Sequence, residues 1–118
     1  MYCHRIWYDY LFFIVKHKMN KVDSFLNIVG ALNDETRILI LNFLSANGET
    51  CVCDLQNMLD MKQSRLSRHL KILKDSGFLY VNRKGAWAYY GINNHLTSFH
   101  QQALQAIEEL DLRRLPPF

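Results

Sequence analysis

One segment carries most of the fold information: residues 61–92 read MKQSRLSRHLKILKDSGFLYVNRKGAWAYYGI. Its first part predicts a helix from Gln63 to Ser76 that ends at Gly77, because apolar residues recur there at i, i+4 and i+7. These inward positions are Leu66, Leu70 and Leu73. A polar stripe is expected on the opposite side of the helix: Ser64, Ser67, Arg68 and Lys71. The pattern indicates a helix with one buried face and one solvated face.

The second part of the segment predicts a β-hairpin. Phe78–Arg83 and Ala86–Ile92 are rich in aromatic and β-branched residues, and Lys84-Gly85 separates them as a turn with a basic tip. Upstream, Leu55, Met58 and Leu59 share one face of a short helix, and residues 60–62 form a tight turn before the basic helix. A short helix, a turn, a basic helix and a hairpin together predict a winged helix-turn-helix.

Three further helices complete the expected fold. The first has an apolar stripe at Val22, Phe25, Leu26 and Val29. The second begins at an Asn33 N-cap, is apolar on nearly every side over Ile38–Leu44, and ends at Asn47-Gly48. The last spans His95–Leu110, with a seam formed by Leu96, Phe99, Ala103, Ile107 and Leu110. That seam is too apolar to leave in water, so we expect it to pack on a second copy. The fold class is mainly α with a small β-hairpin wing: about five helices, one two-stranded hairpin, and a homodimer.

Length and composition fit one globular domain. The chain has 118 residues, of which 49% are apolar and 21% charged, too few residues for a barrel or a two-domain enzyme. We assign residues 19–118 to a DNA-binding and dimerisation domain and residues 1–18 to an N-terminal extension. The extension is interpreted as a packing or dimer-covering helix, as an upstream artefact with the true start at Met19, or as a membrane attachment. Its apolar run, Ile6–Val15, is far shorter than the roughly 20 residues that span a bilayer.

The charge distribution points to nucleic acid. The net charge of +3 combines +6 over residues 61–84 with −3 over the rest of the chain. Side chains near the start of the basic helix can reach base edges, and cations further along can neutralise phosphates. The predicted DNA-binding residues are Gln63, Ser64, Arg65, Ser67, Arg68, Lys71, Arg83 and Lys84. A merely solvated basic face is the alternative, but the turn spacing, the inward leucines and the basic hairpin agree on double-stranded DNA.

Two runs and the wing resemble the ArsR/SmtB family of winged-helix metalloregulatory repressors. The runs are ALNDETR at 31–37 and QSRLSRHLKIL at 63–73, and the wing shares Gly85, Trp87 and Tyr90. The resemblance covers about residues 20–96. It implies a homodimer joined through its first and last helices, bound to an operator with two-fold symmetry and released by an inducer. It also implies that Gln63, Ser64, Ser67 and Arg68 face the bases, and that His69 packs locally or bonds a phosphate.

The segment ETCVCDLQ at 49–56 is similar to the family's arsenic-sensing motif, ELCVCDLC. Gln56 stands where the motif has a third cysteine, and Thr50 where it has leucine. The resemblance implies that Cys51 and Cys53 bind trivalent arsenic, as arsenite or methylarsenite. Arsenic takes three thiolates, so the third comes from Cys3, from a small cellular thiol, or is not needed when the inducer is a methylated arsenical.

The spacing of the two cysteines has a geometric consequence. On a helix, residues two apart are rotated by about 200°, so chelation by both thiols requires an extended chain around Cys51–Cys53. We expect the ligand to displace the entry of the helix-turn-helix and thereby lower operator affinity. A disulfide between these residues would close a very small ring and is not expected as a stable bridge.

Other functions are also consistent with these residues. A cadmium-, lead- or bismuth-responsive repressor of the same family would use Cys3 as an extra ligand, and a thiol redox regulator would use the same pair. A winged-helix interaction module with a vestigial metal site is a further class. We expect no enzyme and no organic cofactor, because the sequence has no phosphate loop, cofactor motif or Ser-His-Asp spacing. Three cysteines cannot close a set of disulfides and no secretory leader is recognisable, so we expect a cytoplasmic protein without membrane contact.

Overall fold

The computed structural model of this protein describes residues 21–110 and residue 112. A helix covers residues 21–32 of that part. The elements that follow are α2 (Glu35–Asn47), β1 (Thr50–Cys51), α3 (Val52–Leu59), α4 (Gln63–Asp75), β2 (Leu79–Lys84), β3 (Trp87–Ile92) and α5 (Ser98–Glu108). The predictions for residues 1–18, Cys3 and a start at Met19 lie outside the described residues. The predicted winged helix-turn-helix is confirmed.

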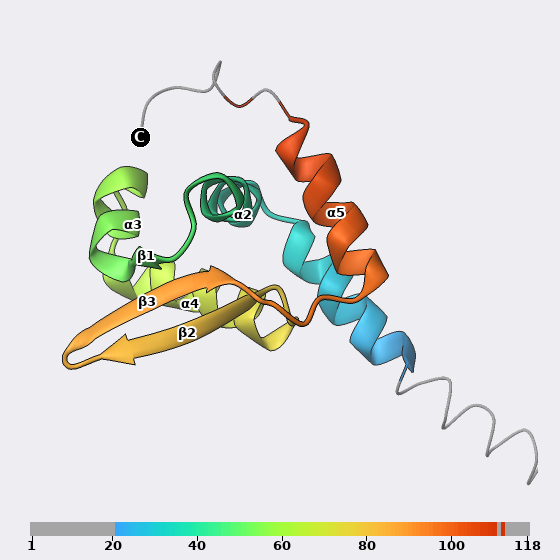
Figure 1. Cartoon of the computed structure of the whole chain (residues 1–118), viewed down its shortest axis with the longest axis horizontal. Helices are drawn as coiled ribbons and strands as arrows, with labels where there is room; N and C mark the ends of the chain where they lie inside the picture. Colours follow the sequence, from blue (N-terminus) through green and yellow to red (C-terminus); the bar gives the residue numbers. More distant parts are fainter. Residues whose placement is uncertain (1–20, 111, 113–118) are drawn as a thin grey trace, which may run out of the picture.

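The core forms around α2, which lies between α3 and α5 with the sheet and α4 below it in Figure 1. The predicted inward face of α4 is confirmed, since Leu66, Leu70 and Leu73 are fully buried. They pack in one cluster with Ile40 and Leu41 of α2. Burying a leucine or isoleucine side chain contributes about 1.5–3 kcal/mol, so this cluster fixes the direction of the basic helix.

The start of α2 differs from the prediction by one residue. Asp34, not Asn33, is the N-cap, because its extended backbone lets the carboxylate accept a hydrogen bond of 3.1 Å from the Arg37 backbone N–H. A carboxylate also suits the positive end of the helix dipole. The predicted end at Gly48 is confirmed: its φ is +80°, and its N–H donates to the Leu44 carbonyl.

The sheet has three antiparallel strands in the order β1-β3-β2, so the expected two-stranded hairpin is incomplete. In the additional strand, Thr50 is the partner of Tyr90 and Cys51 that of Tyr89. Two residues are too few to show a strand's alternation in sequence. The predicted turn also shifts by one residue, because Lys84 pairs with Trp87 and leaves Gly85-Ala86 as the loop.

The last helix begins later than predicted, at Ser98 instead of His95. Thr97 is its N-cap: its hydroxyl accepts from the His100 backbone N–H at 3.3 Å, and the Thr97 N–H donates to His100 Nδ1 at 3.3 Å. This capping box fixes the boundary. The intervening residues 93–97 connect β3 to the helix.

His100 itself is buried. Its Nε2 donates to the Ser76 carbonyl at 2.8 Å, and its ring stands edge-on to Phe78 with centroids 4.6 Å apart. His100 thereby links α5 to the end of α4. His95, in contrast, is exposed.

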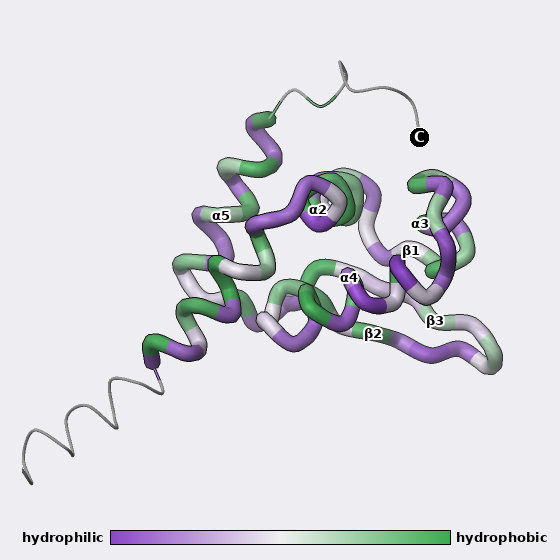
Figure 2. Tube along the Cα trace, turned by 180° about the vertical axis from the view of Figure 1, so that it is seen from behind, coloured by the Kyte–Doolittle hydropathy of each residue, from purple (hydrophilic) through white to green (hydrophobic). Residues whose placement is uncertain are grey.

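The predicted apolar seam of α5 divides between two environments. Ile107 is buried in the chain's own core, which corrects its expected role at the dimer contact, whereas Leu110 is 48% exposed. Phe99 packs against Phe25 of helix 21–32, with ring centroids 5.0 Å apart. These two helices lie side by side at one end of the molecule, and the hairpin tip extends at the other (Figure 2). Within residues 21–110, no helix is both long and apolar enough to cross a membrane.

Candidate DNA interface and thiol site

All eight predicted DNA-binding side chains are exposed. Six follow the start and outer face of α4: Gln63, Ser64, Arg65, Ser67, Arg68 and Lys71. The other two, Arg83 and Lys84, end β2 at the wing. Lys62 is the N-cap of α4 and makes no side-chain capping bond, so the first turn of the helix has uncapped backbone donors. Exposed cations and free N–H groups at a helix start suit phosphate contacts.

Two of the cations are paired with acids in the free protein. Lys71 Nζ donates to Asp75 at 2.9 Å, and this hydrogen bond raises the pKa of the Lys71 ammonium. Lys84 Nζ lies 3.4 Å from Glu49 and 4.7 Å from the Tyr89 ring centroid. Exposed ion pairs of this kind are weak, so a phosphate can replace either carboxylate.

Arg37 joins three elements, a role that sequence reasoning missed. Its Nε donates to the Ala31 carbonyl at 2.7 Å, and an Nη donates to the Gly30 carbonyl at 3.2 Å. Its other Nη lies 3.1 Å from Nδ1 of His69 on α4. Arg37 thus connects the end of helix 21–32 to α4, the predicted recognition helix of the helix-turn-helix. The sequence showed only an arginine in the first turn of α2; its partners depend on tertiary packing.

The surroundings of His69 favour its neutral form. Burial lowers the pKa of His69, Asp34 opposes that shift, and the guanidinium of Arg37 adds to it. Neutral Nδ1 can then accept the Arg37 hydrogen bond. Of the two roles expected for His69, the structure places it in local packing.

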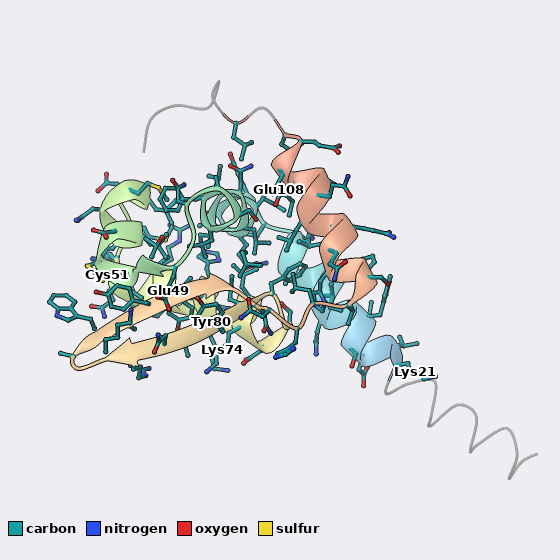
Figure 3. All side chains as sticks on the ribbon, viewed as in Figure 1. Lys21, Glu49, Cys51, Lys74, Tyr80 and Glu108 are labelled. Carbon is teal, nitrogen blue, oxygen red and sulfur yellow. A yellow bond between two sulfur atoms is a disulfide. The ribbon has the colours of Figure 1, made fainter. Side chains whose placement is uncertain are left out.

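The two cysteines meet at the corner between β1 and α3, where Figure 3 labels Cys51. Cys51 is the N-cap of α3 with an extended backbone, whereas Cys53 is already helical. Their Cα atoms are 5.2 Å apart, and Cys51 Sγ accepts from the Cys53 N–H at 3.3 Å. The expectation that the chain must be extended over both residues is therefore wrong, because the strand-to-helix corner alone brings the sulfurs together.

The sulfurs of Cys51 and Cys53 are bonded to each other in the structure, a pairing that the sequence did not lead us to expect as a stable bridge. In the reduced protein, the same corner presents two thiols to one ligand at a helix N-terminus, which favours negative charge. The described residues contain no cluster of three or more His, Cys, Asp or Glu side chains that could hold a metal ion. The donors present fit two of the three positions of trivalent arsenic.

The thiol pair and the predicted DNA-binding face share one cavity of about 340 Å³. Its walls include Cys51, Cys53 and the neighbouring Gln56. Three of the predicted DNA-binding residues, Gln63, Ser67 and Arg83, line the same cavity. The rest of the lining comes from the wing and the core: Val52, Leu70, Ala86, Trp87, Ala88 and Tyr90. A ligand on the thiols would therefore lie between the recognition helix and the wing.

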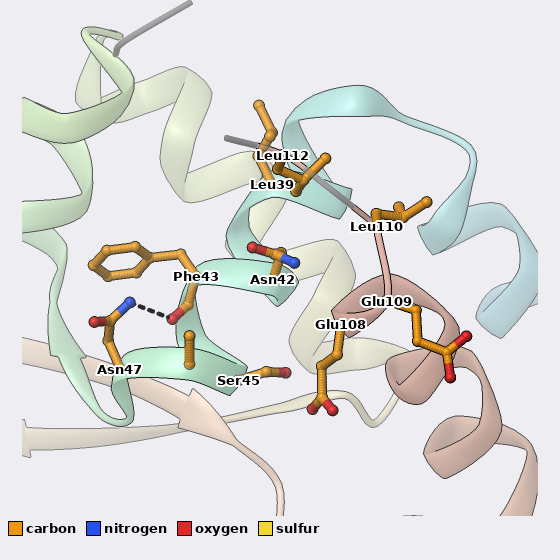
Figure 4. Close-up of a pocket in the computed structure, with 10 residues that line it drawn as sticks. Leu39, Asn42, Phe43, Ser45, Asn47, Glu108, Glu109, Leu110 and Leu112 are labelled. Atoms are coloured by element: carbon orange, nitrogen blue, oxygen red, sulfur yellow. Dashed lines mark hydrogen bonds between the residues drawn. The ribbon is translucent and has the colours of Figure 1, made fainter. Parts of the chain in front are cut away.

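A second, larger cavity of about 860 Å³ lies between α2 and the end of α5 (Figure 4). Phe43, Asn47 and Glu108 are among its lining residues, and the Asn47 amide donates to the Phe43 carbonyl at 2.9 Å. None of the predicted site residues lines it. It is thus separate from the shared cavity.

Comparisons with known proteins identify a family and similar relatives. The sequence profile described as "Bacterial regulatory protein, arsR family" matches residues 34–81. The arsenical resistance operon repressor of Escherichia coli is 44% identical over 68 residues, which are 58% of each chain. The arsenic resistance transcriptional regulator ArsR2 of Pseudomonas putida is 38% identical over 79 residues, 67% of this chain and 69% of that protein. The match thus spans less than two thirds of the Escherichia coli protein.

Among solved structures, the chain is similar to the homodimeric winged helix-turn-helix DNA-binding domain of a possible ArsR-family regulator from Mycobacterium bovis. The TM-score is 0.62 at 26% sequence identity, and the match covers 76% of this chain and 77% of that one. The similarity extends beyond the profile match and includes the winged helix-turn-helix as a whole.

Proposed function

The chain belongs to the ArsR family of bacterial regulatory proteins, and on that basis we propose that it is a DNA-binding repressor of an arsenic resistance operon that trivalent arsenic releases from its operator. The family consists of transcriptional regulators, so the chain is not an enzyme. One observation carries the proposal: the cavity lined by Cys51 and Cys53 is also lined by Gln63, Ser67 and Arg83. The proposed sensing site and the predicted DNA-binding face would therefore be adjacent. We expect the protein to act in the cytoplasm.

The DNA-binding part of the proposal rests on α4 and the wing. The buried leucines of α4 leave its polar face in solvent, where the first-turn side chains can enter a major groove. Gln63 can bond adenine and Arg65 or Arg68 guanine in bidentate fashion. Lys71, Arg83 and Lys84 suit the phosphate backbone.

A homodimer accounts for the exposed apolar side chains of helix 21–32. Val22, Phe25, Leu26 and Val29 are 40–57% exposed on one stripe. A second copy that covers this stripe and the adjacent face of α5 would bury it. Two copies related by a two-fold axis would read half-sites about 10 bp apart, or a multiple of that spacing.

Release follows from the position of Cys51. This residue pairs with Tyr89 of the wing strand and also begins the first helix of the helix-turn-helix. When reduced Cys51 and Cys53 bind arsenic, movement of this corner would pass directly to the wing and, through α3, to α4. Coupling of this kind is usually 1–3 kcal/mol, or about 5- to 150-fold in affinity.

The test is a titration of the reduced protein against the DNA upstream of its gene, followed by fluorescence anisotropy. We expect arsenite to release the DNA, and the Cys51→Ser, Cys53→Ser double variant to bind DNA but ignore arsenite. Full release in the double variant would contradict the proposal. Parallel titrations with lead, bismuth and cadmium, in the full chain and in Cys3→Ser, separate the alternative repressor that uses Cys3.

A thiol redox regulator is a second candidate, favoured by the bond between the two sulfurs in the structure. In that case oxidation to the disulfide, with no metal or metalloid present, would change DNA affinity. The measurement compares peroxide-treated and reduced protein on the same DNA. Equal affinities of the two forms would exclude this candidate and leave the arsenic proposal intact.

A further inference from the structure

We propose that Trp87 is an apolar DNA contact: in the complex, its indole packs against deoxyribose rings of the strand that passes between α4 and the wing. Trp87 does not belong to the DNA-binding set predicted from the sequence, whose members are all polar or charged. This inference rests on the proposed function, because it adds a contact to the same protein–DNA interface.

The side chain of Trp87 contributes little to the chain's own core. Trp87 is the first residue of β3 and is 58% exposed, slightly more than Leu26 in the apolar stripe of helix 21–32. A single exposed apolar residue needs no explanation by itself. A tryptophan offers a large apolar area to a partner, however, and is favoured at interfaces for that reason. Its surroundings therefore decide which partner would cover it.

Trp87 lies among the predicted DNA-binding residues. It is the cross-strand partner of Lys84 in the hairpin. It also lines the cavity of about 340 Å³ together with Gln63 of α4 and Arg83 of β2. The expected dimer surface on helix 21–32 is at the opposite end of the molecule from the hairpin tip (Figure 2). A second copy that packs on that surface would leave Trp87 uncovered.

The path of bound DNA would bring a sugar-phosphate strand to this cavity. In the proposed complex, α4 enters the major groove and the hairpin reaches the adjacent groove. Neighbouring grooves of a duplex are separated by a sugar-phosphate backbone, so one strand has to pass between the two elements. The cavity that Gln63, Arg83 and Trp87 line lies between α4 and the wing. Trp87 is thus on the path of that strand.

The side chains around the cavity match the two chemical components of the strand. Phosphates carry charge and suit the exposed cations Arg83 and Lys84. Deoxyribose rings present C–H groups, which are better placed against an apolar surface than in water. The indole of Trp87 and the exposed methyl group of Ala86 provide such a surface beside the cations.

An apolar contact differs from a phosphate contact in its dependence on salt. Each neutralised phosphate releases condensed counterions, so the logarithm of the affinity falls with the logarithm of the salt concentration by about 0.9 per contact. Packing of an indole on a sugar releases no counterions. Since every nucleotide carries the same sugar, the contact is also independent of base sequence.

The test measures DNA affinity of the full reduced chain by fluorescence anisotropy over a series of salt concentrations. Trp87→Ala should lower the affinity about tenfold at every concentration, because less apolar area is removed from water, and should leave the salt slope unchanged. Arg83→Ala is the matched control, which should lower the affinity and also make the slope shallower by about one. Trp87→Phe retains an aromatic ring and should recover part of the loss.

Unrelated DNA distinguishes a sugar contact from base reading. Trp87→Ala should weaken binding to DNA of unrelated sequence by the same factor as binding to the operator. The Trp87 side chain is largely exposed, so the thermal unfolding midpoint of Trp87→Ala should equal that of the parent.

Tryptophan fluorescence reports the contact itself. The chain has two tryptophans, and Trp7→Phe leaves Trp87 as the only one. Acrylamide is a neutral quencher and is not repelled by DNA. We expect it to quench Trp87 at least threefold less strongly when the protein is saturated with its operator.

Unchanged DNA affinity in Trp87→Ala, or equal quenching of Trp87 in the free and DNA-bound protein, would overturn this inference alone. A shallower salt slope in Trp87→Ala, or a loss confined to the operator, would also overturn it. If the parent protein binds neither its operator nor unrelated DNA, the proposed function fails and this inference fails with it.

Discussion

Arg37 adds polar contacts between α4 and the end of helix 21–32 to the apolar packing of the buried α4 leucines. It donates to two carbonyls at the end of helix 21–32 and contacts His69 of α4, with only 11% of its side chain exposed. Removing such a donor leaves several acceptors without partners, and each costs about 1–3 kcal/mol where it is buried. The identity of this side chain therefore affects both stability and the placement of α4.

We expect Arg37→Gln to lower the free energy of unfolding by about 2 kcal/mol, measured by urea denaturation. Arg65→Gln, the same change at an exposed position of α4, should stay within about 0.5 kcal/mol of the parent. Equal losses in the two variants would show that the Arg37 contacts are not the cause.

His69 makes part of the stability depend on pH. Its pKa lies below the ordinary value of 6.5 because of burial, with Asp34 opposing the shift and Arg37, Arg65 and Arg68 adding to it. The folded state therefore binds fewer protons than the unfolded state, so this contribution is fully present above about pH 6.5 and is lost as the pH falls.

His69→Gln keeps a side-chain acceptor but does not titrate. Its urea stability should therefore decline less than that of the parent between pH 7 and pH 5, and the comparison of the two proteins cancels the other titrating groups. A parallel decline in both proteins would count against a neutral His69.

At the scale of elements, the junction of α4 and β2 depends on one glycine. Gly77 has a φ of +90°, and a Cβ there would lie 3.2 Å from His100 Nε2. Gly30, in contrast, lies in helix 21–32 with open space around it. A change from glycine to alanine is therefore expected to have opposite effects on stability at the two positions.

Gly77→Ala should lower the melting temperature, by the equivalent of at least 1 kcal/mol, because alanine is strained at positive φ and crowds His100. Gly30→Ala should raise it, by up to about 1 kcal/mol, because alanine favours the helix. Differential scanning calorimetry of both variants tests this account; a neutral Gly77→Ala would contradict it.

The elements differ in how far the sequence predicts them. The leucine spacing of α4 is sufficient to place the helix and its buried face, because a helix of 13 residues shows several turns of the pattern. β1 has two residues and exists only through its pairing with β3, so no local pattern reveals it. The proximity of Cys51 and Cys53 likewise depends on the corner where β1 ends and α3 begins, and the burial of His100 depends on Ser76 and Phe78.

At the scale of the whole molecule, the apolar stripe on helix 21–32 is the surface on which we expect a second copy to pack. Phe25 is 50% exposed although its ring contacts Phe99, and Leu26 is 57% exposed. A surface of this kind is costly in a monomer and is buried when two copies meet. The paired recognition helices needed for a symmetric operator would follow from that contact.

We expect Leu26→Asp to weaken the dimer at least tenfold, since a carboxylate would have to be buried without a partner, while circular dichroism stays that of the parent fold. Sedimentation velocity over a concentration series measures the dimer. Asn27→Asp introduces the same charge at an exposed neighbour and serves as the control. An unchanged dimer in Leu26→Asp would move the interface elsewhere.

In the function proposed here, the thiol pair and the DNA face are coupled through the cavity that they share. The most direct measurement is the dissociation constant of arsenite for the reduced protein, free and saturated with its operator. Linkage requires DNA to weaken arsenite binding by the same factor by which arsenite weakens DNA binding, about 5- to 150-fold. Equal arsenite affinity in the free and the DNA-bound protein would contradict the account.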